Sequence, residues 1–424
     1  MKIKAPLSFA SIVVVLLMAL AVRFYYISNN ERNGYNATSW DAFGYYMYQP
    51  GMLLYNDVTK LEWLPRIDSV YQVTGGKLYQ AHIYKNGNYV FKYLGGICFL
   101  QLPFFGIGHI AAIIFNYPRD GFSSPYQYAI IFGAIFWLML GLFFLRQVLL
   151  SYFSDLIAGL TIASLFLATN LPQYFSVDGA MSHSWIFPQY CIMLWLTHKW
   201  HNRPSYLLSF AIGLLCGLAT ISRPTEIIIL FIPLLWRLNE QISNSKWTFL
   251  RVHWQHLVWL FLGGFVGVLP QLIYWKFASG SFVYDVGSKW YFLNPWFRVL
   301  FGSYSGWFVY TPLTILFIVG FWFMRKLPFT QAVITFTVLN IWIVIAWSEW
   351  QYGISYSGRA LAQGSPVYAL SLASVLNYFY NGRKRIIIIG AVLFLSVINF
   401  YQIAIYNSGR FNNFSVVELI LSKI

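Results

Sequence analysis

Long runs of apolar side chains constrain this chain more than any other feature. The first runs from residue 7 to residue 28, and comparable runs follow along most of the sequence. A bilayer core is about 30 Å thick, so a helix of about 20 apolar residues crosses it. Hydrophobic residues make up 58% of the chain and charged residues 10%, and a water-soluble domain cannot cover that much apolar surface. The sequence therefore predicts an all-α polytopic membrane protein.

The apolar windows predict about eleven transmembrane helices within one integral membrane domain, residues 1–424. The predicted spans are residues 7–28, 126–146, 156–176, 183–199, 205–222, 224–239, 257–276, 309–324, 328–347, 361–379 and 386–406. The first run also resembles a signal peptide, because Ala19-Leu20-Ala21 imitates a cleavage site. Its length and the spans that follow favour an uncleaved helix whose N-terminus is cytoplasmic.

The cationic residues test this topology, because cytoplasmic loops collect Lys and Arg. Threading the chain with residue 1 inside places nearly all dense cationic loops in the cytoplasm: Arg146; Lys199 and Arg203; Arg237, Lys246 and Arg251; Arg325 and Lys326; Arg383, Lys384 and Arg385. The net charge of +15 is explained in the same way, and no nucleic-acid partner is expected. The short cytoplasmic loops favour a bacterial inner membrane.

Two long segments then fall on the extracytoplasmic side, residues 29–125 and residues 277–308. Residues 94–116 are apolar enough to span, but counting them as a span would invert the topology of everything downstream. We therefore expect them to form re-entrant or interfacial helices, broken near Pro103 and Gly106-Ile107-Gly108. Irregular backbone concentrated on one face indicates that the protein works on that face.

Asp41 is the most informative acidic residue, because it follows Trp40 just beyond the outer end of the first span. Charged groups near a membrane are costly and therefore suggest function. Asp41 is a candidate general base. The alternative is that Ser39 or Asp41 only caps a short interfacial helix.

Two further external turns carry polar residues. Asp178 precedes a glycine between two predicted spans, which is also ordinary turn chemistry, and His183 follows it. Arg223 joins two spans without a polar spacer and must lie at the external interface. There it either extends its charge to water or binds a phosphate in a bidentate manner.

Lys92 and Arg359 are two more external cations at the edges of apolar segments. Together with Arg223 they predict a cationic pocket beside carboxylates, which suits an anionic lipid headgroup. The chain has no Asp-x-Asp pair, no nucleotide-binding glycine loop and no zinc-protease motif, so neither a metal nor a cofactor is expected.

With these residues placed, the chain resembles the GT-C class of membrane glycosyltransferases. The greatest similarity is to the protein O-mannosyltransferase superfamily, including the lipid A aminoarabinose transferase. Those enzymes begin with one helix and a long external loop that opens with an acid near a tyrosine, as Asp41 and Tyr45 do here. Residues 94–116 match the interfacial helices of that loop, Asp178 matches an acid after the third helix, and Arg223 matches a phosphate-binding cation.

The chain departs from the family pattern at two of these positions. The family often has Asp-Glu where this chain has Asp41-Ala42, and Lys is common where it has Arg223. An arginine supplies the same charge with a different geometry.

The resemblance implies an inverting transfer of a sugar from a polyprenyl-phosphate donor to the hydroxyl of a glycolipid, glycan or protein. Asp41 would deprotonate that hydroxyl, and cations would stabilise the departing phosphate. The implied phosphate-binding residues are Arg223, Lys92 and Arg359, and the implied pocket residues are Trp40, Tyr45, Asp178 and His183. One alternative is a glycan ligase or polymerase with a lipid-diphosphate donor. The other is a transporter, which is expected to show repeats and midplane charges that the sequence lacks.

Overall fold

The structure is a computed structural model that describes residues 5–28, 37–237, 248, 251–303, 305–353, 355–380 and 384–408. It is 71% helical. Among the described residues, five helices are long and apolar enough to cross a membrane: α1 (Pro6–Ser28), α5 (Gly96–Ile114), α6 (Ser124–Leu150), α12 (Trp254–Ser279) and α18 (Arg385–Asn407). These helices agree with the predicted membrane protein.

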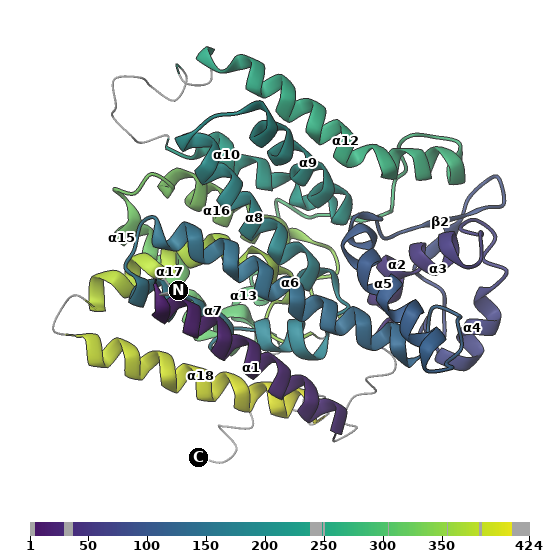
Figure 1. Ribbon diagram of the computed structural model, residues 1–424, viewed down its shortest axis with the longest axis horizontal. Coiled ribbons are helices and arrows are strands. Elements are labelled where there is room, and N and C mark those ends of the chain that lie inside the picture. Colours follow the sequence, from purple (N-terminus) through teal and green to yellow (C-terminus); the bar gives the residue numbers. More distant parts are fainter. Residues whose placement is uncertain are drawn as a thin grey trace.

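Further helices complete the bundle (Figure 1). Those of the membrane domain are α7 (Asp155–Leu167), α8 (Ser182–Asn202), α9 (Tyr206–Ser222), α10 (Phe231–Leu235), α13 (Arg298–Phe301), α14 (Trp307–Tyr310), α15 (Ile315–Met324), α16 (Thr330–Ala346) and α17 (Ser365–Tyr380). Tighter or wider turns form the π-helix η2 (Gln173–Val177) and the 3₁₀-helices η3 (Pro224–Leu230), η4 (Pro312–Thr314) and η5 (Arg359–Gly364).

Several predicted spans are not single α-helices. Within predicted span 156–176, α7 ends at Leu167, and the chain becomes helical again at Leu171 and Pro172, which lead into η2. Within span 224–239 the described part is η3 followed by α10, and span 361–379 begins inside η5. The predicted residues 29–36, Lys246 and Arg383 lie outside the described residues.

The predicted break in residues 94–116 is wrong. Helix α5 continues from Gly96 to Ile114 with Pro103 inside it. The nearby glycine has a packing role instead, because a Cβ at Gly108 would lie 2.7 Å from the backbone of Tyr126 in α6. Because Gly108 has no Cβ, α5 and α6 can approach each other closely. This helix is also long enough to cross a bilayer.

The described part of the segment between α1 and α5 folds into short elements at one end of the bundle (Figure 1). They are α2 (Asp41–Tyr46), α3 (Tyr48–Leu53), α4 (Leu64–Tyr71) and an antiparallel hairpin of β1 (Ala81–Ile83) and β2 (Tyr89–Phe91). The sequence analysis did not predict this hairpin. It is fastened to the end of α12, because the side-chain amides of Asn86 and Asn88 both donate to the Ala278 carbonyl (2.9 and 3.1 Å).

Helices α9 and α12 pack through glycines (Figure 1). A Cβ at Gly213 would lie 1.9 Å from the Leu260 carbonyl oxygen, and one at Gly263 would lie 2.1 Å from the Phe210 carbonyl oxygen. Only glycine fits at such distances, so the two backbones are in direct contact.

Candidate active site

A cavity of about 640 Å³ lies between the short elements that follow α1 and the helical bundle. Seven of the eight residues that the sequence analysis proposed line it, and they come from segments far apart in the chain. Its polar and aromatic lining includes Trp40, Asp41, Tyr45, Tyr79, Lys92, Tyr93, His183, Arg223, Glu226, Tyr284, Asp285, Trp290, Asn340, Trp347, Glu349, Tyr352, Arg359 and Gln363.

Asp41 is the first residue of α2, and its backbone is held by an unusual neighbour. Trp40 has a positive φ of 59°, a region that few non-glycine residues adopt. Two hydrogen bonds secure it: the Trp40 amide donates to the Val73 carbonyl (2.9 Å), and the Gln80 side chain donates to the Trp40 carbonyl (3.0 Å). No side chain caps α2, so the capping alternative for Asp41 is not what the structure shows.

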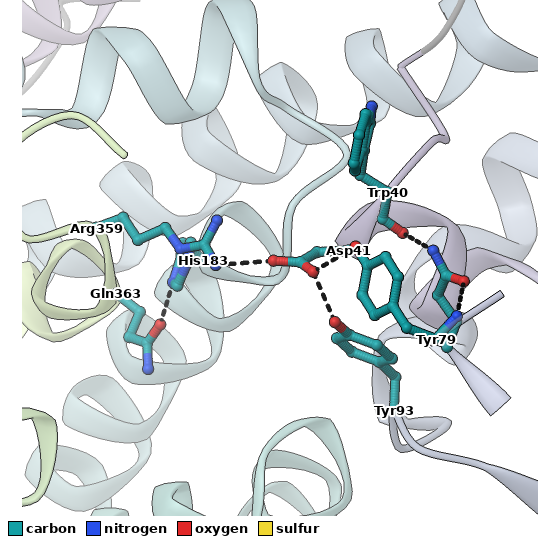
Figure 2. A network of polar contacts seen from close by, with 8 residues as sticks. Trp40, Asp41, Tyr79, Tyr93, His183, Arg359 and Gln363 are labelled. Carbon is teal, nitrogen blue, oxygen red and sulfur yellow. Dashed lines mark hydrogen bonds and ion pairs between the residues drawn. The ribbon is translucent and has the colours of Figure 1, made fainter. Parts of the chain in front are cut away.

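Both carboxylate oxygens of Asp41 are bound by protein groups (Figure 2). Tyr79 and Tyr93 donate their hydroxyls to Oδ1 at 2.9 and 2.6 Å. Arg359 donates from Nη2 to Oδ2 at 2.7 Å, forming an ion pair whose side chains are 15% and 25% exposed for Arg359 and Asp41. Burial alone raises the pKa of Asp41, but Arg359 and the two hydroxyls outweigh it and lower that pKa to about 2.

Tyr45 forms part of the wall behind Asp41. It lies on the buried side of α2, and its ring meets the Tyr93 ring edge-on with centroids 4.8 Å apart. Burial raises the pKa of the Tyr45 hydroxyl, so this residue stays neutral and supplies a hydrogen-bonding group. The contact also fixes the ring whose hydroxyl binds Asp41.

Three cations converge on the cavity from separate elements. Lys92 directly follows β2, Arg223 lies between α9 and η3, and Arg359 begins η5. The Nη1 atom of Arg223 is buried and has no hydrogen-bond partner within the described part of the chain. An unsatisfied buried donor is costly, and an acceptor that entered the cavity would satisfy this one.

His183 lies at the start of α8, and a line of hydrogen bonds through Gln363 to Glu226 holds its ring. Its Nδ1 is 2.6 Å from Oε1 of Gln363, whose Nε2 donates to Oε1 of Glu226 at 2.5 Å. Tyr190 donates to the other oxygen of Glu226 at 2.6 Å. The sequence analysis assigned no role to Glu226 or Gln363, although polar residues inside apolar runs were an available signal.

Asp178 does not line the cavity, unlike the other predicted residues. It ends the π-helix η2, accepts from the Gln173 side chain at 2.8 Å, and its carbonyl accepts from the Met181 amide at 3.0 Å. Those bonds are those of a turn, which was the alternative reading of the Asp-Gly pair.

The sequence analysis also missed other groups of the site. Tyr79 and Tyr93, which bind Asp41, carry no motif that distinguishes them from the many tyrosines of the chain. Asp285 and Glu349 add acidic groups to the lining. The described residues contain no group of three or more His, Cys, Asp and Glu side chains that could hold a metal ion. The prediction that no metal is needed remains a prediction.

Comparisons with known proteins were made for the sequence and for the fold. The sequence matches no protein-family model and no curated protein. The structure matches archaeal oligosaccharyltransferase AglB from Archaeoglobus fulgidus, solved with an inhibitory peptide and a dolichol-phosphate (TM-score 0.52, 12% identity). It also matches the A. fulgidus oligosaccharyltransferase tethered to an acceptor peptide with the NVT sequon (TM-score 0.53, 11% identity).

The chain is similar in fold to an oligosaccharyltransferase. The matches cover 96% and 95% of this chain but 56% and 55% of the other chains, so it spans little more than half their length. AglB is a GT-C glycosyltransferase, and the predicted GT-C resemblance is therefore confirmed at the level of the fold. The finer resemblance to the protein O-mannosyltransferases stays a prediction.

Proposed function

We propose that this protein is an inverting glycosyltransferase that moves a sugar from a polyprenyl-phosphate donor to an acceptor hydroxyl. The observation that carries the proposal is one cavity that holds Asp41 and, beside it, three cations, of which Arg223 has an unsatisfied buried donor. The dolichol-phosphate of the AglB complex is a lipid of the proposed donor class, which supports this choice. The acceptor is a glycolipid, a glycan or a protein.

The transfer step has a simple balance of bonds. The acceptor oxygen loses its proton to Asp41 and bonds to the anomeric carbon, while the bond from that carbon to the phosphate oxygen breaks. Its electron pair goes to the phosphate, where negative charge develops. Fixed guanidiniums at Arg223 and Arg359, with Lys92, stabilise that charge in a cavity partly shielded from water. The proposal requires no metal ion.

Asp41 must regain basicity before it can act. With Arg359 at 2.7 Å and two hydroxyls on Oδ1, it is a weak base. A donor phosphate is a second anion that competes for Arg359. Sharing the guanidinium weakens its hold on Asp41 and raises the pKa of that carboxyl, so the base becomes competent when the donor is bound.

We further propose a bacterial inner-membrane location with the cavity on the extracytoplasmic face. Under this topology the first external segment, which supplies Asp41 and Lys92, covers the outer end of the bundle. The lipid-linked donor would then reach the cavity from the bilayer and the acceptor from outside.

The test is transfer by the full chain reconstituted in liposomes. The donors are radiolabelled polyprenyl-phosphate sugars and, in parallel, polyprenyl-diphosphate sugars, with membrane extract as acceptor. We expect label to move from at least one monophosphate donor. Transfer from diphosphate donors alone would contradict the proposed donor and favour a ligase or polymerase, and no transfer from any donor would contradict the proposed reaction.

A further inference from the structure

Three buried side chains form a line of hydrogen bonds that ends at the cavity. Glu226 from η3, Gln363 from η5 and His183 from α8 are each 3% exposed or less. The bonds are 2.5 Å from Gln363 to Glu226 and 2.6 Å between Gln363 and His183. Such a line of hydrogen bonds can serve the site by fixing which nitrogen of the His183 ring carries the proton.

The chemistry of the three groups fixes the direction of these bonds. Glu226 accepts from the Gln363 amide NH₂ and from the Tyr190 hydroxyl, so Gln363 turns its carbonyl oxygen toward His183. A carbonyl oxygen only accepts, so Nδ1 of His183 must carry the proton. In a neutral imidazole the other nitrogen, Nε2, then has a free lone pair.

The surrounding charges favour the neutral ring. Arg223 and Arg359 line the same cavity as His183, and their positive charges oppose a second proton on the ring. Tyr174 faces the ring edge-on, with centroids 5.6 Å apart. Figure 2 shows His183 next to Arg359, on the opposite side of Asp41 from Tyr79 and Tyr93.

Many of the groups that line the cavity are hydrogen-bond donors, so a hydrogen-bond acceptor there has a specific use. Arg223, Arg359 and Lys92 can only donate, and the tyrosines that bind Asp41 already use their protons. A substrate hydroxyl needs a group that accepts its proton in a hydrogen bond. Asp41 has both oxygens occupied in this structure, whereas His183, like Asp285 and Glu349, offers an acceptor to the cavity that it lines.

We propose that His183 accepts a hydrogen bond through Nε2 from a substrate hydroxyl, and that Gln363 and Glu226 are positioning residues that fix its tautomer. The inference deepens the proposed function, on which its second half rests. The hydroxyl belongs either to the transferred sugar or to the acceptor, and the kinetics below separate these sources.

The first measurement is independent of transfer. Nitrogen NMR of the full chain in lipid nanodiscs, labelled with ¹⁵N-histidine, reports which ring nitrogen carries the proton. The His183 signal is assigned by its loss in His183→Gln. We expect protonation on Nδ1 alone at neutral pH, and a shift toward Nε2 protonation in Gln363→Leu. A wild-type signal with the proton on Nε2, or on both nitrogens, overturns the inference.

The second measurement is the KM for donor and for acceptor. We expect His183→Gln to raise one of the two KM values about tenfold, the loss typical of one hydrogen bond, with a smaller change in kcat. The KM that rises identifies the molecule that carries the hydroxyl. The same KM should rise at low pH in the wild type, where protonation of Nε2 removes the acceptor, and should not do so in His183→Gln.

His198→Gln is the matched control, since His198 lies on the same helix α8 outside the cavity and contacts Tyr152. Unchanged KM values and an unchanged pH profile in His183→Gln would overturn the substrate contact. A wild type that transfers no label contradicts the proposed function and with it that contact, whereas the NMR result still decides the tautomer.

Discussion

At the scale of residues, the central feature is Asp41, a carboxylate whose basicity is lowered by the protein groups around it. Asp41 has a pKa of about 2 because Arg359 and two hydroxyls outweigh the effect of burial. Under the proposed function, the ion pair that weakens this base also places Arg359 beside the donor phosphate. One guanidinium would then link donor binding to the basicity of Asp41.

The first prediction concerns the pH dependence of stability. The pKa of Asp41 is lowered from its ordinary value of 3.8, so the stability that it contributes is present above about pH 4 and is lost as pH falls toward 2. Arg359→Gln removes the main charge that lowers this pKa and leaves the burial that raises it. The folded-state pKa of Asp41 then moves back toward or above the unfolded value, so we expect the loss of stability between about pH 4 and pH 2 to be smaller in Arg359→Gln than in the wild type.

This prediction is measured as the unfolding midpoint temperature of the detergent-solubilised protein between pH 3 and 7. Lys85→Gln, an exposed cation on the hairpin turn, controls for the loss of one positive charge. Coincident pH profiles for Arg359→Gln and the wild type would show that the ion pair does not set the pKa of Asp41.

The second prediction concerns Arg223. Arg223→Ala removes a charged group with an unsatisfied buried donor, and we expect kcat for sugar transfer to fall by about 10- to 100-fold, in keeping with hydrogen bonds to charged groups. Arg223→Lys keeps the charge without the planar fork and should recover part of the rate. Equal rates for Arg223→Ala and the wild type would mean that this residue only extends toward water.

At the scale of elements, the third prediction concerns the glycines at the contact between α9 and α12. Gly213→Ala places a Cβ 1.9 Å from a backbone oxygen of α12, whereas Gly264→Ala places one 3.6 Å from its nearest neighbour. We expect Gly213→Ala to lower the free energy of unfolding by about 1 to 3 kcal/mol and Gly264→Ala to leave it nearly unchanged. Denaturant titration in mixed micelles measures both, and equal effects would contradict the close packing.

The elements also show what the sequence can predict. Apolar length predicts the long helices, because bilayer thickness fixes it, and it correctly marks α1, α6, α12 and α18. Prediction from the sequence fails where the same residue type can either break a helix or pack within one. Gly108 was taken as part of a helix break but serves packing, and Pro103 is accommodated within α5. The hairpin was missed because only tertiary contacts, such as those of Asn86, hold it.

The residues of the candidate site also divide into those that the sequence predicts and those that it does not. Asp41, Arg223 and Arg359 were predictable because charged groups at membrane edges are costly and therefore informative. Tyr93 and Gln363 were not, because a tyrosine or glutamine acquires its role only from a partner brought close by folding. Asp178 satisfied a sequence pattern but forms a turn instead.

At the scale of the whole molecule, the fourth prediction concerns topology. Lys85 lies on the hairpin turn and Lys326 lies between α15 and α16, and both are exposed. In cells, a membrane-impermeant maleimide should label Lys85→Cys without permeabilisation and Lys326→Cys only after it. The three native cysteines, replaced in the background, occupy apolar segments. The reverse pattern would contradict the proposed orientation.

The molecule as a whole is similar to only part of an oligosaccharyltransferase. Nearly all of this chain matches, but little more than half of each AglB structure does.

The most direct test of the account is sugar transfer in liposomes by Asp41→Asn, compared with Asp178→Asn outside the cavity. The account predicts that Asp41→Asn folds normally and loses at least about 100-fold in transfer rate, as expected for removal of a general base, while Asp178→Asn retains most of its activity. Equal transfer by Asp41→Asn and the wild type would contradict the central claim that Asp41 is the base.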